Sequence, residues 1–252
     1  MRLLALTCGW LTGDAGLFAA GATGRLRVPV PCFLIEHPQG LVLFDSGLHA
    51  EAATAPEARL GSAASLFAVE LAPHEDVGAR LAALGVSPGA VRFLVTSHLH
   101  FDHTGGHATI PNAALVVQRA EWTAARDPEL ARGLLYDPAN YDLGHEVRCV
   151  DGEHDLFGDG RVVCLPTPGH TPGHQSLRVR PDHGPEVVLA ADACYLRRTL
   201  DELALPAFAW DAEAQRASVL RLRALRAAGA RIVPGHDPEA WATVPQAPSA
   251  LA

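Results

Sequence analysis

One short segment of the chain carries four side chains of the types that bind metal ions. His98, His100, Asp102 and His103 fall within six consecutive positions, directly after the apolar run 91–96. A lone histidine is more often held by hydrogen bonds than bound to a metal, but packing does not explain four such residues together. Imidazole and carboxylate are ligands that suit zinc and neighbouring transition metals. The segment therefore predicts a metal site.

The spacing of these four residues indicates how their side chains meet. In an extended segment, residues two apart share a face, so His98, His100 and Asp102 would lie on one side. A turn at residues 104–106, Thr-Gly-Gly, would let His103 point toward a second centre. The segment is thus expected to serve two metal ions.

Three further polar residues stand where apolar runs end, at positions where loops carry chemistry on a rigid sheet. They are His170 after the run 161–165, Asp192 after 186–190, and His236 after 231–233. A carboxylate in such a place is costly to bury unless a cation lies beside it. Each residue alone could mark a turn or cap a helix. Because all three stand at strand ends, we interpret them as parts of one metal site.

Seven candidate ligands suffice for two metal ions with positions left open for water. Two divalent ions a few ångströms apart lower the pKa of water, polarise a carbonyl group and stabilise the oxygen that departs. A structural zinc site, in contrast, is closed by four ligands. The residue types therefore indicate hydrolysis rather than a purely structural role.

The elements that must position these residues follow from periodicity and turn signals. Strands are predicted at residues 28–36, 41–44, 91–96, 114–118, 161–165, 175–179, 186–190 and 231–233, and helices at 75–84, 120–126 and 212–228. The order of sheet, helix, strand and helix in both halves predicts an α/β fold in which two sheets lie between helical layers.

Two segments are not expected to form regular elements. Residues 127–142, which include Pro128 and Pro138, are predicted to be an irregular excursion that could act as a lid. The Pro/Ala-rich stretch after Trp241 is expected to be a loose end. No linker or internal repeat divides the chain, so a single domain over residues 1–252 is expected.

Composition and charge exclude several classes of protein. The 252 residues are 48% hydrophobic and 19% charged, which is typical of a folded globular chain and not of a disordered one. The formal net charge of -8 repels polyanions, so nucleic acid is not an expected partner. The five cysteines contain no C-x-x-C pair and do not predict a disulfide framework.

The hydropathy pattern does not predict a membrane protein. No apolar stretch approaches the roughly 18 residues of a spanning helix, so membrane insertion is not expected. Residues 3–11 resemble a weak signal peptide, but Asp14 interrupts the pattern, and a first strand in a cytoplasmic protein is the preferred interpretation. The sequence does not indicate an oligomeric state.

In their order along the chain, the candidate ligands resemble the metallo-beta-lactamase superfamily. The pattern is His98-x-His100-x-Asp102-His103 followed by His170, Asp192 and His236, and it extends over nearly the whole chain. Further segments are similar to the N-acyl homoserine lactonases, which degrade bacterial quorum signals. They are Ser-His-Leu-His-Phe-Asp-His-Thr-Gly-Gly, Thr-Pro-Gly-His-Thr-Pro-Gly-His-Gln-Ser-Leu, Asp192-Ala-Cys-Tyr195 and Gly235-His236-Asp237. Tyr195, three residues after Asp192, is the most specific match.

The resemblance implies a fold and a cofactor. The fold is an αββα sandwich of two mixed sheets flanked by helices, and the cofactor is a pair of Zn²⁺ ions, with other divalent transition metals possible. Asp192 would bridge the two ions. One ion would be held by His98, His100 and His170, and the other by Asp102, His103 and His236.

The resemblance also implies a reaction, the ring opening of an N-acyl homoserine lactone, which is a small-molecule substrate. The Tyr195 hydroxyl would stabilise negative charge on the carbonyl oxygen, and Asp102 would pass a proton to the departing ring oxygen. Tyr195 could instead be a half-buried aromatic residue whose hydroxyl reaches water. An acyl chain needs an apolar groove, for which Phe101 is favoured because it lies within the motif. The candidates are Leu17, Phe18, Leu66, Phe67 and Phe101.

Three residues outside the ligand set fall at positions that the family pattern also describes. Asp45 lies in Phe-Asp-Ser-Gly where the family usually has Asp-Thr-Gly beside the ligands, so Ser46 departs from the pattern. His174 resembles a partner of the ligands rather than a ligand. His107 stands where the family frequently has asparagine, and we interpret it as surface variation.

Related activities would use nearly the same ligands. The alternatives are a lactonase that opens a pyridoxine-derived lactone, such as 4-pyridoxolactonase, and a glyoxalase-II-like thioesterase. The thioesterases usually add a C-terminal helical region with basic contacts, whereas this chain ends soon after His236 and has no Lys. An iron-dependent redox protein on the same fold is an alternative from another class, and its iron absorption bands would distinguish it from a colourless zinc protein.

Overall fold

Two long strands at the start of the chain form the centre of the larger sheet. The computed structural model describes residues 1–252. β1 (Arg2–Asp14) and β2 (Arg25–His37) pair antiparallel along almost their whole length. β3 (Gly40–Phe44) returns beside β2 after a tight turn, in which Gly40 has a φ of 139° that favours glycine. Residues 3–11 thus belong to a strand, as expected.

The larger sheet has seven strands in the order β4-β1-β2-β3-β5-β6-β7. The strands added to the first three are β4 (Ala68–Glu70), β5 (Val91–Val95), β6 (Ala114–Gln118) and β7 (Val147–Val150). From β3 to β7 neighbouring strands are parallel. Parallel strands buried on both faces have nearly continuous apolar sequences, as β5 and β6 do.

The smaller sheet has five strands in the order β12-β11-β10-β9-β8. They are β8 (His154–Asp155), β9 (Val162–Pro166), β10 (Gln175–Val179), β11 (Val187–Ala191) and β12 (Arg231–Pro234). Only β11 and β12 pair in parallel. The connection between them contains α8 (Arg197–Glu202) and α9 (Ala212–Ala227).

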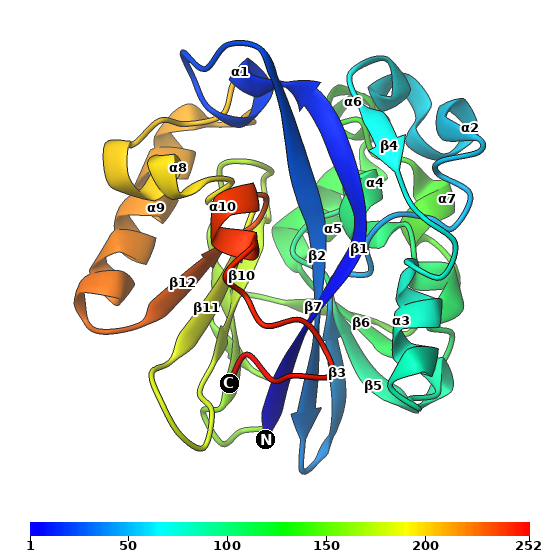
Figure 1. Ribbon diagram of the computed structural model, residues 1–252, viewed down its shortest axis with the longest axis vertical. Coiled ribbons are helices and arrows are strands. Elements are labelled where there is room, and N and C mark those ends of the chain that lie inside the picture. Colours follow the sequence, from blue (N-terminus) through cyan, green and yellow to red (C-terminus); the bar gives the residue numbers. More distant parts are fainter.

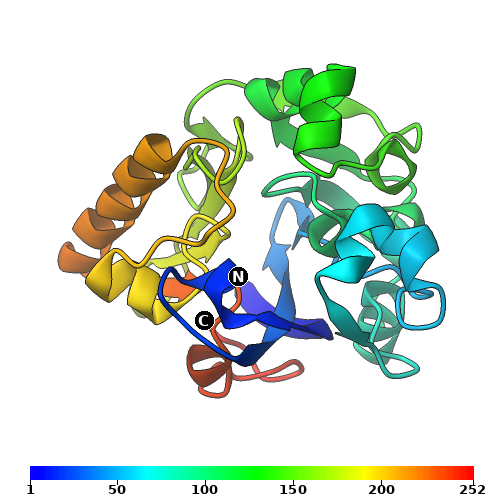
Figure 2. The same cartoon turned by 90° about the horizontal axis from the view of Figure 1, so that it is seen from above.

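The two sheets pack face to face, and helices cover their outer sides (Figures 1 and 2). The largest core cluster joins inner residues of both sheets, such as Phe33 and Val116 from one and Leu177 and Leu189 from the other. On the outer sides, α3 (Val77–Ala83) packs on the larger sheet and α9 on the smaller one. The predicted αββα arrangement is confirmed.

The predicted strands and helices occur within a few residues of their expected bounds. The strands 114–118 and 175–179 have the predicted ends, and the helix predicted at 75–84 begins after Asp76, whose side chain accepts a hydrogen bond from Ala79 N. Asp102, which was expected to lie in an extended segment, instead lies in the short helix α4 (Phe101–Thr104).

The excursion at residues 127–142 is not irregular, contrary to the expectation. After α5 (Arg119–Arg126) it forms α6 (Pro128–Gly133) and α7 (Pro138–Tyr141). Each proline occupies the start of a helix, where its missing N–H costs nothing, and the preceding aspartate caps the helix. Prolines that were read as breakers are therefore helix initiators here.

The C-terminal stretch is not a loose end. After α10 (Pro238–Trp241) the chain lies beside β1, where Leu3 N donates to Ala252 O and Leu251 N donates to Leu3 O, each at 2.7 Å. β4 pairs only with residues 10–12 of β1, so the C-terminal stretch covers the part of the strand that would otherwise be an open edge.

The remaining elements complete the side of the molecule where the site lies. They are α1 (Ala15–Phe18), α2 (Pro56–Leu60) and the short 3-10 helices η1 (Gly61–Ser65), η2 (Pro88–Ala90) and η3 (His107–Thr109). All five cysteines are free, as expected. No helix is both long enough and apolar enough to cross a membrane.

Candidate metal centre

The candidate ligands gather at one end of the two sheets, in the segments that follow β5, β9, β11 and β12. The side chains form two groups. Within each group, the potential ligand atoms all lie within 4.8 Å of one another. We call them the three-histidine group, which is His98, His100, His170 and Asp192, and the mixed group, which is Asp102, His103 and His236. The structure thus brings together all seven residues predicted from sequence.

The division into groups differs from the spacing argument. Asp102 does not share a face with His98 and His100, because the backbone turns into α4 at Phe101 and His100 occupies the position before the helix. Asp102 and His103 therefore belong to the same group. This is the division that the family resemblance implied.

Three imidazole nitrogens of the three-histidine group face one another. His100 Nδ1 lies 2.8 Å from His98 Nε2 and 3.0 Å from His170 Nε2. Burial lowers the pKa of all three rings, and lowers the pKa of His98 and His170 well below its usual value. Neutral imidazoles that converge in this way present lone pairs to a common point, which is the arrangement a metal ion requires.

Asp192 lies between the two groups. Its Oδ2 is 3.3 Å from His170 Nε2, and its Oδ1 is 3.3 Å from His103 Nε2 and 3.1 Å from His236 Nε2. Asp192 Oδ1 and His103 Nε2 are buried and have no hydrogen-bond partner. Unpartnered polar atoms are costly to bury, so these two atoms fit a cation that would lie between them.

The mixed group carries the charge of two carboxylates. Burial lowers the pKa of His103 and His236, but the nearby carboxylates of Asp102 and Asp192 outweigh burial and raise it above its usual value. Burial raises the pKa of Asp192, and the surrounding imidazoles reverse this and hold it well below its usual range. The two carboxylates thus remain ionised and favour a positive charge among the histidines.

Each of the five histidines is held through the ring nitrogen that faces away from the site. Such outer partners fix the tautomer and orientation of metal-binding histidines. His98 Nδ1 lies 3.0 Å from Ser97 Oγ, His100 Nε2 2.8 Å from Leu134 O, His103 Nδ1 2.8 Å from Asp45 Oδ2, His170 Nδ1 3.4 Å from Phe208 O, and His236 Nδ1 2.8 Å from Pro29 O. All five rings therefore present the other nitrogen to the site.

Asp45 and His174 both contact groups of the site. Asp45 accepts hydrogen bonds from Ser97 N and Ser97 Oγ as well as from His103. His174 Nε2 accepts a hydrogen bond from the Asp192 N–H at 3.1 Å, and it belongs to neither group. His174 thus lies beside a candidate ligand, as expected.

Backbone strain is found at two positions of the site. Asp45 has a φ of 57° and Ala191, which precedes Asp192, has a φ of 44°. A left-handed conformation costs a non-glycine residue about 1–2 kcal/mol. Both residues keep this conformation at a carboxylate of the candidate site.

His107 is not at the surface, contrary to the expectation. Its side chain is fully buried, with Nδ1 2.7 Å from Ser46 Oγ and Nε2 2.9 Å from Thr96 Oγ1. Ser46 lies shortly after β3 and Thr96 directly after β5, and both are fully buried. The buried hydroxyls of these two residues need a polar partner, which the His107 ring supplies. Burial lowers the pKa of His107 to about 3.

Replacing His107 with asparagine is expected to make the protein less sensitive to acid. The folded-state pKa of about 3 lies below the unfolded value, so between these values only the unfolded chain binds this proton. Stability supplied by the neutral ring is lost as pH falls below about 6.5, at about 1.4 kcal/mol per pH unit. Denaturant unfolding of metal-replete wild type and His107→Asn at pH 7, 6 and 5 checks this. Parallel pH dependences would contradict it.

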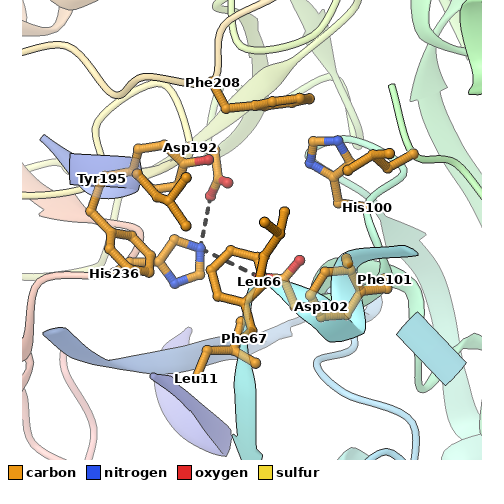
Figure 3. Close-up of a pocket in the computed structure, with 14 residues that line it drawn as sticks. Leu11, Leu66, Phe67, His100, Phe101, Asp102, Asp192, Tyr195, Phe208 and His236 are labelled. Atoms are coloured by element: carbon orange, nitrogen blue, oxygen red, sulfur yellow. Dashed lines mark ion pairs between the residues drawn. The ribbon is translucent and has the colours of Figure 1, made fainter. Parts of the chain in front are cut away.

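An apolar pocket opens onto the two groups (Figure 3). It has a volume of about 620 Å³ including its open mouth, and ten of its 14 lining residues are hydrophobic. Figure 3 shows His236 between the carboxylates of Asp102 and Asp192 on the wall of the pocket. The pocket is lined by all five residues predicted from sequence, Leu17, Phe18, Leu66, Phe67 and Phe101, and also by Leu11, Ala63, Leu135 and Phe208.

Sequence reasoning missed the last four pocket residues for identifiable reasons. Leu135 lies in the excursion that was expected to be irregular, and Phe208 lies in a segment without regular structure. Leu11 and Ala63 are apolar residues of the kind that usually fill a core. The one usable signal was the nearness of Leu11 to Leu17 and Phe18 along the chain.

Tyr195 lines the same pocket beside the three-histidine group. Its side chain is buried, and its hydroxyl lies 3.4 Å from His170 Nδ1. Burial, together with the negative charge of Asp192, raises the pKa of Tyr195 well above its usual value. The hydroxyl therefore keeps its proton and can donate a hydrogen bond into the pocket.

A fold of two sheets between helices, with His/Asp groups at the strand ends, defines a member of the metallo-beta-lactamase superfamily, to which this chain belongs. The model of that superfamily matches residues 25–236. Within it, the chain belongs to the N-acyl homoserine lactonase family of hydrolases. It is 38% identical to the N-acyl homoserine lactonase AttM of Azorhizobium caulinodans, over 88% of this chain and 87% of that protein.

Other relatives agree with this assignment. The chain is 31% identical to an N-acyl homoserine lactonase of Bacillus cereus, over 79% of this chain and 76% of that protein. Among solved structures it is similar to an N-acyl homoserine lactone hydrolase with the product N-hexanoyl-L-homoserine at its catalytic metal centre. That likeness has a TM-score of 0.88 and 26% identity, over 99% of this chain and 98% of the other.

Proposed function

We propose that this chain, as one domain over residues 1–252, is a dinuclear zinc hydrolase that opens the lactone ring of N-acyl homoserine lactones. The observation that supports this most is the apolar pocket that ends on both His/Asp groups and on Tyr195. The polar end of the pocket, at the carboxylates, would bind the lactone ring. The aromatic walls would contact the alkyl chain. The names of the relatives point to the same substrate class.

The donor set fits two zinc ions. The three-histidine group would hold one ion and the mixed group the other, with Asp192 between them, because imidazole and carboxylate are the ligands that zinc prefers. When bound, two such ions lower the pKa of water and polarise a carbonyl group.

The chain's own residues supply binding and proton transfer. The Tyr195 hydroxyl donates a hydrogen bond to the lactone carbonyl oxygen, and this bond strengthens as negative charge develops there. Asp102, which also lines the pocket and is ionised, accepts the proton that the attacking water releases and delivers it to the ring oxygen that leaves. Phe18, Phe67 and Phe101 enclose the acyl chain and exclude water from it.

A pH-stat assay tests the proposal directly, because ring opening releases acid. The panel contains homoserine lactones of increasing acyl length, the pyridoxine-derived lactone, a thioester and a beta-lactam. We expect the homoserine lactones to have the highest kcat/KM, and metal analysis to give about two equivalents of zinc. Preference for the polar pyridoxine-derived lactone or the thioester would contradict the substrate, and iron in place of zinc would contradict the reaction class.

Replacing Tyr195 with phenylalanine is expected to slow turnover without loss of metal. The ring keeps its packing against Phe18 and His236, and only the hydroxyl is removed. A hydrogen bond to a charged oxygen contributes about 1.5–3 kcal/mol, which corresponds to about tenfold to somewhat over a hundredfold in kcat. The measurement is kcat and kcat/KM for a homoserine lactone together with metal content. Unchanged kinetics would leave Tyr195 as a packing residue, and lost metal would make it a ligand.

A further inference from the structure

A fully buried glutamate on α5 contacts the loops that carry the three-histidine group. The side chain of Glu121 has no solvent exposure. Its Oε1 accepts hydrogen bonds from Leu99 N at 3.0 Å and from the Tyr136 hydroxyl. Its Oε2 accepts hydrogen bonds from Thr171 Oγ1 at 2.8 Å and from Gly173 N at 2.9 Å. An ionised carboxylate has about four acceptor positions, and here all of them are used.

The donors to this carboxylate are neighbours of all three histidines in the group. Leu99 lies between His98 and His100, and Thr171 directly follows His170. Through these contacts one carboxylate joins two loops that are about 70 residues apart in the chain. Moving either loop away from the other would leave a buried charge without its donors, which is strongly unfavourable.

Tyr136 adds a third connection. Its hydroxyl donates to Glu121, and its ring lies edge-on to His100 with centroids 5.4 Å apart. Two residues before it, the carbonyl of Leu134 accepts the hydrogen bond from His100 Nε2. Glu121 therefore also fixes the segment that sets the tautomer of His100.

The loop after His170 packs directly on the backbone of Glu121. A Cβ atom at Gly173 would lie 2.1 Å from Glu121 N, so only glycine allows this approach. Because Glu121 lies in the first turn of α5, the N–H groups of the helix start, which lack partners within the helix, also favour its negative charge. The Glu121 carboxylate is thus stabilised by the start of its own helix and by hydrogen bonds from the loops.

We propose that Glu121 is a positioning residue for the three-histidine group, holding the loops of His98, His100 and His170 at the separation a metal ion requires. It has no hydrogen bond to Asp102, His103 or His236, whose group is held instead by Asp45 and by Pro29 O. Removing the Glu121 charge therefore weakens one of the two metal sites and spares the other. This inference rests on the proposed metal centre.

Chelator competition on zinc-loaded protein tests the proposal, with Glu121→Gln as the variant. The amide directs an NH2 group at two of the four donors, while the size of the side chain is kept. Loss of a partner that is hydrogen-bonded to a ligand typically costs about 10- to 100-fold in metal affinity, and loosening the two loops that carry three candidate ligands is expected to have a comparable effect. We expect one zinc equivalent to be released at about 10- to 100-fold lower chelator concentration than in wild type, and the other equivalent within about threefold of wild type.

Asp155→Asn is the matched control. Asp155 is a partly buried carboxylate that accepts hydrogen bonds from Phe157 N and Gly160 N in a turn of the smaller sheet. It undergoes the same change of charge away from the metal centre, so both zinc equivalents should be retained as in wild type. If Glu121→Gln does not fold, Thr171→Val and Tyr136→Phe, which each remove one donor, should weaken the same single equivalent to a smaller degree.

Each outcome decides one question. Wild-type protein that binds less than one equivalent of zinc would contradict the metal centre itself. Wild type with two equivalents and unchanged release from Glu121→Gln, or from both donor variants, would overturn only the role of Glu121. Equal weakening of both equivalents would also overturn it, because a general loosening of the fold is not positioning of one group.

Discussion

Asp192→Ala is expected to lose more than about a hundredfold in kcat/KM and at least one of two metal equivalents. Partners that only orient ligands are worth roughly 10–100-fold, and Asp192 is the one carboxylate whose oxygens lie close to histidines of both groups. Its removal leaves those histidines without the charge that draws a cation between them. Metal analysis and lactonase kinetics on the same preparation measure both effects.

Asp237→Asn provides the control for this change. Asp237 is a buried aspartate next to His236, and its oxygens accept hydrogen bonds only from Arg197 N and Ala240 N. The amide retains one of these acceptors, so metal content should be unchanged. His174→Ala should also cost less activity than Asp192→Ala, since His174 reaches Asp192 only through the Asp192 backbone N–H and belongs to neither group. Equal losses in Asp192→Ala and His174→Ala would mean that Asp192 is not a ligand.

Prolonged chelation is expected to lower the melting temperature by roughly 15 °C or more and to abolish activity. An ion present at about 1,000 times its Kd stabilises the folded chain by about 4 kcal/mol, so two sites contribute about 8 kcal/mol. In a chain of this size each kcal/mol corresponds to about 2–4 °C. Without the ions, Asp102 and Asp192 remain buried together with only histidines to neutralise them.

Calorimetry before chelation, after chelation and after addition of zinc measures this effect. Restoration of both the melting temperature and the activity by zinc alone is the expected result. A chelated protein that melts within about 3 °C of the loaded one would show that the two groups bind metal weakly or not at all.

The candidate ligands could be predicted from sequence because the chemistry is local in the chain. His98, His100, Asp102 and His103 occupy one segment, and each remaining candidate lies shortly after an apolar strand. The strands themselves were predictable because buried parallel strands have continuous apolar sequences. Pairing within each sheet and packing of the two sheets against each other then bring these strand ends to one end of the molecule.

The residues that orient these ligands could not be predicted in the same way. Glu121 looks like an ordinary acidic residue near the start of a helix, and its four donors come from three separate segments. His107 was misjudged because its burial depends on Ser46 and Thr96, which approach only in the folded chain. Contacts between distant segments leave no periodic signal along the sequence.

Three of the five site histidines are oriented by main-chain carbonyl groups, those of Pro29, Leu134 and Phe208. Every amino acid carries the same carbonyl, so substitutions at these positions can alter the neighbouring pocket while the acceptor stays in place. Only His98 and His103 rely on side-chain acceptors, those of Ser97 and Asp45. Residues around this centre, and with them the shape of the pocket, can therefore vary with little effect on the orientation of the candidate ligands.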